Sequence, residues 1–311
     1  MSIRENLLSL SEHSHCILTS SGSAAIITAL ISSGMPKGSE VLIPSLCCPA
    51  VLFAVQIAGF KYKLIDVNKS NFNIDKFSLE KSITANTKAV IAVHMYGIPC
   101  SLIDLSYICK KHNLILIEDS CLILKNKDKI STLSELADFS IISFGYDKPI
   151  SINYGGALFT SNENYFQRAT NFLKENKFFS FSLDKTQEQL LSRKLELLDK
   201  SNELRLRNVS FIESLISKSY LNSHQSFENI PLWRYPILIE NLDRNILIKK
   251  AKEINLIITS HYQSLSRLTY SEDCSNAEFI SDKIINIFVR SDTSLNDIRA
   301  KVNLINSMLH E

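Results

Sequence analysis

The second half of this 311-residue sequence contains no glycine, because all eight glycines lie between Gly22 and Gly156. Glycine permits tight turns and lets the backbone approach a ligand closely. A chain that gathers this residue in one half is expected to carry its ligand site there. We therefore predict that the functional site is built from the first half.

The sequence also lacks long apolar runs and a strong charge of either sign. No stretch approaches the roughly 20 apolar residues that a membrane span needs, and residues 1–12 lack the apolar run of a signal peptide. The 34 basic and 32 acidic side chains leave a formal net charge of +2, and lysine and arginine are scattered. These features argue against nucleic-acid and membrane partners and favour a cytoplasmic protein.

Paired cysteines are absent as well. The seven cysteines follow no regular spacing and include no CxxC pair, so no metal site is predicted. An odd number without a framework favours reduced thiols in the cytoplasm, most of them small core residues.

Short β-branched runs alternate with helical patterns through the first 160 residues. Such alternation implies right-handed crossovers and a mostly parallel sheet that is covered on both faces, so we expect an α/β fold. The predicted strands are 40–44, 62–67, 88–95, 114–119, 138–144 and 156–160, and the predicted helices are 23–33, 50–58, 74–83 and 102–112, with a short helix within 1–12.

The remainder of the chain is helical at first and then mixed. A leucine-rich helical pattern runs from about residue 162 to 221 and is consistent with a long helix that links two domains. Strands are predicted at 234–240, 256–259 and 285–289, with helices between and after them. We expect a large α/β domain over residues 1–205 and a small C-terminal α+β domain over 206–311.

The segment from Ser20 to Ala25 (SSGSAA) stands at the start of a predicted helix. Free N–H groups and the helix dipole favour an anion at this position, and the small residues let a phosphate approach. The alternative is a simple N-cap by Ser21 or Ser23. Taken alone, the segment leaves both interpretations open.

Two charged positions follow predicted strands. Asp119 comes after the apolar run LILI, and an acid there can bind a metal, a ribose or a protonated heterocycle, or can act as an N-cap or in a loop salt bridge. Lys148 ends SFGYDK, and a lysine on a loop at the mouth of a sheet can form a Schiff base once it is partly deprotonated. The alternative for Lys148 is a solvated surface lysine.

The three features occur together in an order that matches one cofactor. Pyridoxal phosphate (PLP) requires a phosphate anchor, an acid that keeps its pyridine nitrogen protonated, and a lysine that forms an imine with its aldehyde. The sequence therefore predicts a PLP site in which Lys148 is the imine-forming residue.

Over most of its length the sequence resembles the DegT/DnrJ/EryC1/StrS family, the PLP-dependent sugar aminotransferases of aminotransferase fold type I. Five segments carry the resemblance, with weaker C-terminal similarity at RYPILIE and SHYQSL. They are SGSAA (21–25, like SGT-A), GSEVLIPS (38–45, like GDEVIVPS), VHMYGIPCSL (93–102, like HxYG-P), IEDSC (117–121, like IEDAA) and SFGYDK (143–148, like SFxxxK).

The resemblance implies roles by position. Lys148 and Asp119 would be catalytic, with Asp119 at the pyridine nitrogen, while the phosphate would be held by Gly22, Ser23 and Ser143. The implied activity moves an amino group, usually from glutamate, to a nucleotide-linked keto-deoxysugar for surface polysaccharide or a secondary metabolite. Members of the fold place the site at a dimer interface, which implies a homodimer.

Three further residues are candidates for substrate contact. His94 and Tyr96 either line the pocket or belong to a packed loop after a strand, and His261, with Tyr262 beside it, reaches the sugar or a partner subunit. The other histidines, at positions 13, 15, 112, 224 and 310, are expected at the surface.

Three departures from the family pattern keep alternatives open. Leu122 stands where a glutamine contacts the cofactor, Cys48 stands where an aromatic ring stacks on it, and no GYNxR segment occurs between Ala169 and Gln187. A same-fold dehydratase is one alternative, although sugar dehydratases of the family replace the lysine with histidine. A non-catalytic or regulatory paralogue is the other.

Overall fold

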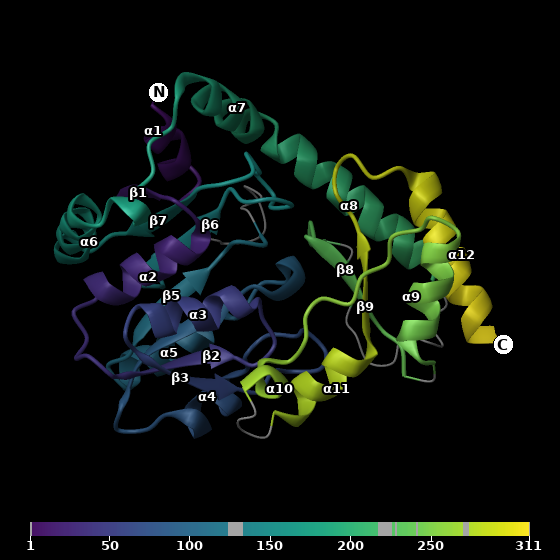
Figure 1. Ribbon diagram of the computed structural model, residues 1–311, viewed down its shortest axis with the longest axis horizontal. Helices are drawn as coiled ribbons and strands as arrows, with labels where there is room; N and C mark the ends of the chain where they lie inside the picture. Colours follow the sequence, from purple (N-terminus) through teal and green to yellow (C-terminus); the bar gives the residue numbers. More distant parts are fainter. Residues whose placement is uncertain are drawn as a thin grey trace.

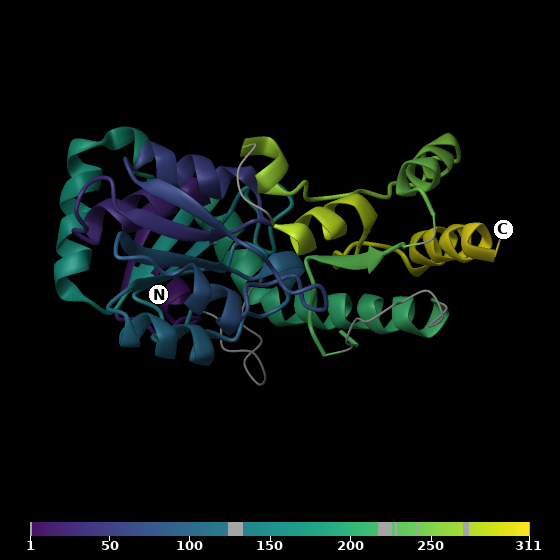
Figure 2. The ribbon, with the colours of Figure 1, turned by 90° about the horizontal axis from the view of Figure 1, so that it is seen from below.

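The computed structural model describes residues 2–123, 133–216, 226–227, 229–240, 242–269 and 274–310. Two parts are visible in Figure 1: a large sheet with its helices, and a smaller two-stranded sheet with helices of its own. The long helix α8 (Leu198–Leu215) runs from the first part along the second. Seen from below in Figure 2, the C-terminal helix lies at the end remote from the large sheet.

Seven strands form the large sheet in the order β1-β7-β6-β5-β4-β2-β3. The β2–β3, β2–β4, β4–β5 and β5–β6 pairs are parallel, and β7 pairs antiparallel with both β6 and β1. The mostly parallel sheet is therefore confirmed. The strands are β1 His15–Thr19, β2 Glu40–Pro44, β3 Lys61–Ile65, β4 Thr87–Val93, β5 Ile115–Asp119, β6 Phe139–Ser143 and β7 Gly156–Thr160.

Helices cover both faces of this sheet, as continuous apolar strands require. One face packs in a single buried cluster with α2, α3 and α6. The opposite face packs with α4 and α5 at one end and with α1 and α7 at the other. These helices are α1 Ile3–Leu8, α2 Gly22–Ser32, α3 Pro49–Ile57, α4 Lys76–Ser82, α5 Leu102–Lys111, α6 Glu163–Glu175 and α7 Lys185–Glu196, with short 3₁₀ turns η1 Met95–Gly97 and η2 Lys177–Phe179.

The smaller sheet is an antiparallel pair, β8 Arg234–Leu238 and β9 Ile284–Phe288. Around it lie α9 Arg244–Glu253, α10 Leu265–Thr269, α11 Ser275–Lys283 and α12 Leu295–His310. The strand predicted at 256–259 is wrong: only an isolated bridge joins Thr259 to Asn286. The N–H of Leu256 instead bonds to the carbonyl of Ala251, which closes the end of α9.

The predicted strands and helices of the first 160 residues match the observed ones to within two residues at each end, apart from the shorter first helix. The strand β1 was not predicted. The proposed division at 205/206 falls inside α8 and stays a prediction. Among the described residues, no helix combines the length and apolar composition that crossing a membrane requires.

Candidate active site

The carboxyl ends of the parallel strands meet at one edge of the large sheet, the position where such sheets bind ligands. Pro44 ends β2, Val93 ends β4, Asp119 ends β5 and Ser143 ends β6. The start of α2 lies at the same edge, because Ser21 forms a bridge with Gly155 just before β7. Segments separated by more than 100 residues are thereby brought together.

The N-terminus of α2 fits an anion. The Ser21 hydroxyl accepts a hydrogen bond from the N–H of Ala24 at 3.0 Å, and the helix itself does not use the N–H groups of Gly22 and Ser23. A Cβ added at Gly22 would lie 3.0 Å from Sγ of Cys121 and 3.0 Å from Cβ of Ser143. Glycine is required here because three segments converge on its backbone, while Ser21 also fulfils the predicted N-cap.

Asp119 is buried and fixed in orientation. Its Oδ1 accepts a hydrogen bond from the N–H of Cys121 at 3.0 Å, and the side chain is 5% exposed. Burial, together with the charge of Asp119, raises the pKa of the Cys121 thiol well above its ordinary range. The thiol beside Asp119 is therefore neutral.

Lys148 lies on the loop between β6 and β7 and is half-buried. Its N–H bonds to the carbonyl of Gly145 at 3.3 Å, and the N–H of Gly145 bonds to the Ser143 hydroxyl at 3.2 Å. Nζ of Lys148 lies 5.6 Å from the ring centroid of Trp233. The amine therefore sits between the strand-end loop and the second sheet.

Cys121 marks the point where the predicted site residues converge. Its sulfur lies against Gly22, its thiol is influenced by the negative charge of Asp119 and the positive charge of Lys148, and Cys48 acts on it as well. The N–H groups of Gly22 and Ser23 (the α2 cradle), the carboxylate of Asp119 and the amine of Lys148 thus all lie in the neighbourhood of Cys121. This arrangement fits pyridoxal phosphate: Gly22, Ser23 and Ser143 would hold its phosphate, Asp119 its ring nitrogen and Lys148 its aldehyde carbon.

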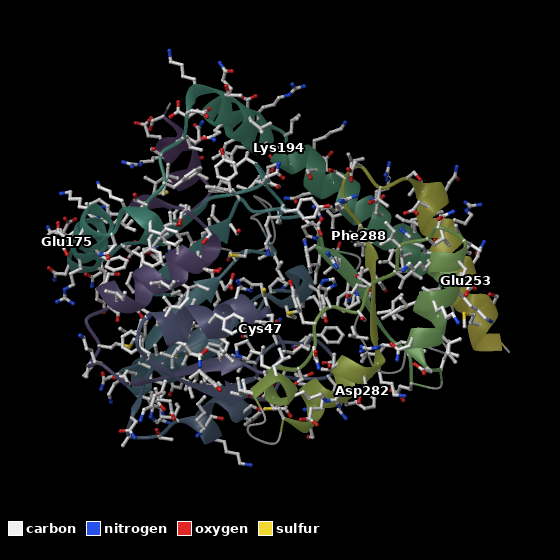
Figure 3. The ribbon with its side chains drawn as sticks, in the orientation of Figure 1. Cys47, Glu175, Lys194, Glu253, Asp282 and Phe288 are labelled. Carbon is white, nitrogen blue, oxygen red and sulfur yellow. The ribbon has the colours of Figure 1, made fainter. Side chains whose placement is uncertain are left out.

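Two departures from the family pattern, Cys48 and Leu122, stand at positions expected near the cofactor ring, and they differ in their surroundings. Cys48 is partly exposed at the N-cap of α3, close enough to Tyr262 to influence its pKa. Leu122 is buried within the main apolar cluster, so it cannot supply the hydrogen bond of a glutamine. Figure 3 places the neighbouring Cys47 near the middle of the molecule, toward the second sheet.

The structure favours packing over pocket lining for His94 and Tyr96. Both are 0% exposed, and Nδ1 of His94 accepts from the N–H of Cys100 while Nε2 lies 2.9 Å from Glu118. The Tyr96 hydroxyl donates to the carbonyl of His261 at 2.6 Å. These two residues are therefore packed side chains of the loop after β4, whereas His261 is exposed and stays a candidate.

Trp233 and Tyr262 complete the site from the second part of the chain. Their rings stack at 6.2 Å with an interplanar angle of 12°. The N–H of Trp233 bonds to the carbonyl of Tyr96 at 2.8 Å, which ties the residue before β8 to η1, just after β4. Trp233 was not predicted as a site residue, and the signal that could have indicated it is its place directly before RYPILIE.

Residues 169–187, which lack the GYNxR pattern, lie beside the α2 cradle, the N-terminus of α2 with Gly22 and Ser23. This stretch contains the end of α6, η2 and the loop that leads to α7. The N–H of Ser20 bonds to the carbonyl of Phe179 at 2.9 Å, and Phe181 packs against Gly155. Apolar side chains therefore stand at this border of the site.

A buried network lies directly beneath Asp119. Glu118 accepts hydrogen bonds from the hydroxyls of Ser120 and Ser140 and from the N–H groups of Leu133 and Ser134, besides its contact with His94. Burial alone raises the pKa of a carboxyl, but hydrogen bonds from His94, Ser140 and Ser120 outweigh it and hold the pKa of Glu118 below its ordinary value. The network fixes the strand end that carries Asp119.

His13 extends this network, so the prediction that it lies at the surface is wrong. It is 6% exposed, and its Nε2 lies 2.8 Å from the Ser140 hydroxyl that donates to Glu118. Of the other histidines, His15 and His112 are partly exposed. His224 and the side chain of His310 lie outside the described residues.

Protonation of His13 is expected to lower the free energy of unfolding in acid. Burial lowers the pKa of His13 from 6.5 to about 4, against the charges of Glu118 and Glu12. The unfolded chain takes up this proton near pH 6.5 and the folded chain only near pH 4, so stability present above pH 6.5 is lost as the pH falls toward 4. The free energy of unfolding should decrease by roughly 3 kcal/mol at most across this window, as measured by urea unfolding.

The variant His13→Gln should flatten this slope between pH 6.5 and 4. His112→Gln, at the C-cap of α5, serves as the comparison for a partly exposed histidine and should change the slope less than His13→Gln does. An equal slope in the parent and in His13→Gln would refute the assignment.

Residues 3–306 match the DegT/DnrJ/EryC1/StrS aminotransferase family. The chain belongs to this family. The match extends over both sheets, so it includes the α2 cradle, Asp119, Lys148 and the second part of the chain together.

The chain is similar to two curated aminotransferases that are named for sugar substrates. It is 27% identical over 283 residues to a 3-oxo-glucose-6-phosphate:glutamate aminotransferase of Bacillus subtilis, covering 85% of this chain and 63% of the relative. It is 28% identical over 221 residues to a dTDP-3-amino-3,6-dideoxy-alpha-D-galactopyranose transaminase of Aneurinibacillus thermoaerophilus, covering 67% and 60%. The chain thus spans less than two thirds of either relative's length.

A solved structure shows the same fold. NtdA from Bacillus subtilis, with bound cofactor PMP, superimposes with a TM-score of 0.87 at 22% identity, covering 99% of this chain and 76% of that one. The expected α/β aminotransferase fold is therefore confirmed.

Proposed function

We propose that this chain is a PLP-dependent aminotransferase that moves an amino group to a nucleotide-linked keto-deoxysugar. Glutamate is the proposed amino donor. The observation that carries the proposal is the convergence on Cys121 of the α2 cradle, Asp119 and Lys148. The sugar-phosphate and dTDP-sugar names of the two relatives support the substrate class. Surface polysaccharide or a secondary metabolite is the proposed destination of the product.

Each residue has a separate task in this proposal. The N–H groups of Gly22 and Ser23, with the Ser143 hydroxyl, bind the phosphate at the positive end of α2. Asp119 holds a proton at the ring nitrogen. When bound, PLP supplies an electron sink that makes a carbon-bound proton of the amine removable. Nζ of Lys148 moves that proton, and Trp233 and Tyr262 exclude water from one side.

A homodimer in the cytoplasm is part of the proposal. Tyr146, two residues before Lys148, is 78% exposed, and Tyr154 on the same loop is 46% exposed. A second copy that covers these rings at the mouth of the site would bury apolar surface. Light scattering of the purified protein tests the dimer, and Tyr146→Asp should weaken it.

Cofactor uptake and amino transfer test the function directly. The purified protein is expected to take up PLP and turn yellow, and the colour should bleach with borohydride or with glutamate. ¹⁵N-glutamate should then label the amino product from one member of a panel of nucleotide-linked keto-sugars and keto-sugar phosphates. A colourless protein that takes up no PLP would favour the non-catalytic paralogue instead.

A further inference from the structure

The residue before the proposed reactive lysine adopts an unusual backbone conformation. Asp147 has a φ of 59°, in the left-handed region that non-glycine residues rarely adopt. Such a conformation persists only where surrounding contacts hold it. The contacts that hold Asp147 therefore determine where the amine of Lys148 points.

Those contacts come from Trp233 and Arg234, at the start of β8, and from Arg290, which follows β9. The indole Nε1 of Trp233 donates a hydrogen bond to the carbonyl of Asp147 at 2.5 Å. Nη2 of Arg234 lies 2.8 Å from Oδ2 of Asp147, with 7% and 6% of the two side chains exposed. Arg290 approaches the same carboxylate at 3.6 Å. Backbone and side chain of Asp147 are thus both held from outside the loop.

The guanidinium of Arg234 is itself held in place. Its Nη1 donates to the hydroxyl of Thr259 at 3.0 Å and lies 2.9 Å from Nδ1 of His261. It stacks 4.0 Å from the Trp233 ring and 4.4 Å from the Phe288 ring, which Figure 3 labels on β9. A buried, planar cation fixed on several sides is a rigid partner for a carboxylate.

The Trp233 ring also meets the lysine directly. Nζ of Lys148 lies 5.6 Å from its centroid, and Tyr262 stacks against the same indole. The negative face of an aromatic ring attracts an ammonium group and limits where its tip can move. One pair of neighbouring residues therefore contacts the loop backbone, the loop carboxylate and the amine.

We propose that Trp233 and Arg234 are positioning residues that hold the Asp147 backbone and so aim the amine of Lys148 into the site. The inference rests on the proposed role of Lys148 and adds how its place is set. The ion pair between Arg234 and Asp147 links the two sheets at the reactive loop, so Arg234 contributes to the site without touching the amine itself.

The apoprotein permits a test that does not depend on activity. Lys148 is labelled with limiting acetic anhydride from pH 7 to 10.5, without cofactor, and its labelled peptide is quantified against a free-amine standard. In Arg234→Leu and in Trp233→Phe, which keeps an aromatic ring but loses Nε1–H, the rate of Lys148 labelling at pH 8 should differ from that of the parent by at least about three-fold, because the loop is no longer held. In Arg234→Lys the dependence of Lys148 labelling on pH should be closer to that of the parent than it is in Arg234→Leu.

Arg267→Leu is the matched control, because Arg267 also pairs with an aspartate, Asp282, but on α11 and away from the loop. It should leave the Lys148 profile unchanged. With PLP bound, Arg234→Leu should lower kcat at least about ten-fold while KM for the amino donor changes less than two-fold.

Parent-like Lys148 labelling in folded Trp233→Phe or Arg234→Leu protein would overturn the proposal, and circular dichroism identifies which variant is folded. Because labelling needs neither PLP nor substrate, the positioning role can fail while the aminotransferase assay succeeds. The reverse result, altered labelling in a protein that binds no PLP, would count against the proposed function alone.

Discussion

Lys148→Ala is expected to abolish transamination, with a loss of at least about 10³-fold in turnover. In the proposed mechanism the variant loses both the amine that would bind the cofactor covalently and the group that would move the substrate proton. Proton transfer by a positioned side chain alone contributes roughly 10²–10⁴-fold. Borohydride treatment followed by peptide mass spectrometry should show the reduced cofactor on residue 148 in the parent and on no residue of the variant.

The fold should survive this substitution, because Lys148 is only half-buried and its Nζ meets the surface of the Trp233 ring. Thermal unfolding of the apoprotein is expected to stay within a few degrees of the parent. Lys249→Ala, at an exposed position of α9, is the control and should keep both the adduct and the activity. A reducible adduct that persists in Lys148→Ala would show that another lysine carries the chemistry.

Asp119→Asn is expected to lower kcat on the order of a hundred-fold or more, with PLP affinity changed far less. An amide of the same shape can still accept the hydrogen bond from the N–H of Cys121, so the strand end should keep its structure. It cannot hold a proton at the ring nitrogen as a carboxylate does. Losing one preorganised electrostatic contact to developing charge costs roughly 10²–10³-fold in turnover.

The measurement is a steady-state assay with a PLP titration followed by absorbance. The matched control is Asp104→Asn on α5, whose carboxylate is half-exposed and pairs with Lys76 at 3.8 Å. Unchanged turnover in Asp119→Asn would remove the assignment. A large loss of PLP binding with normal turnover at saturation would instead make Asp119 an anchoring residue.

The neutral Cys121 thiol between Asp119 and Gly22 has a consequence for the same variant. Burial and Asp119 both raise the pKa of this thiol, so the thiol adds no negative charge of its own. In Asp119→Asn the thiol therefore cannot replace the carboxylate beside the pyridine nitrogen of the proposed cofactor.

The alternation of strands and helices in the first 160 residues was predictable from the sequence because apolar periodicity is local. The order of the α2 cradle, Asp119 and Lys148 was predictable for the same reason, since each follows a recognisable strand or begins a helix. The strand β1 escaped prediction because its five residues carry little pattern, and its pairing with β7 joins positions such as His15 and Thr160.

The sequence by itself determined the fold class, the family and the residues that would have to meet. Only the tertiary structure decided what surrounds them: Trp233 and Arg234 against the loop of Lys148, and His13 and Ser140 beneath Glu118. Apart from Ser140 and Glu118, which are 22 positions apart, these contacts join residues more than 80 positions apart, and they depend on how the two sheets and their helices pack. Local propensity and spacing contain no information about such packing, so burial and partners emerge only with the folded chain.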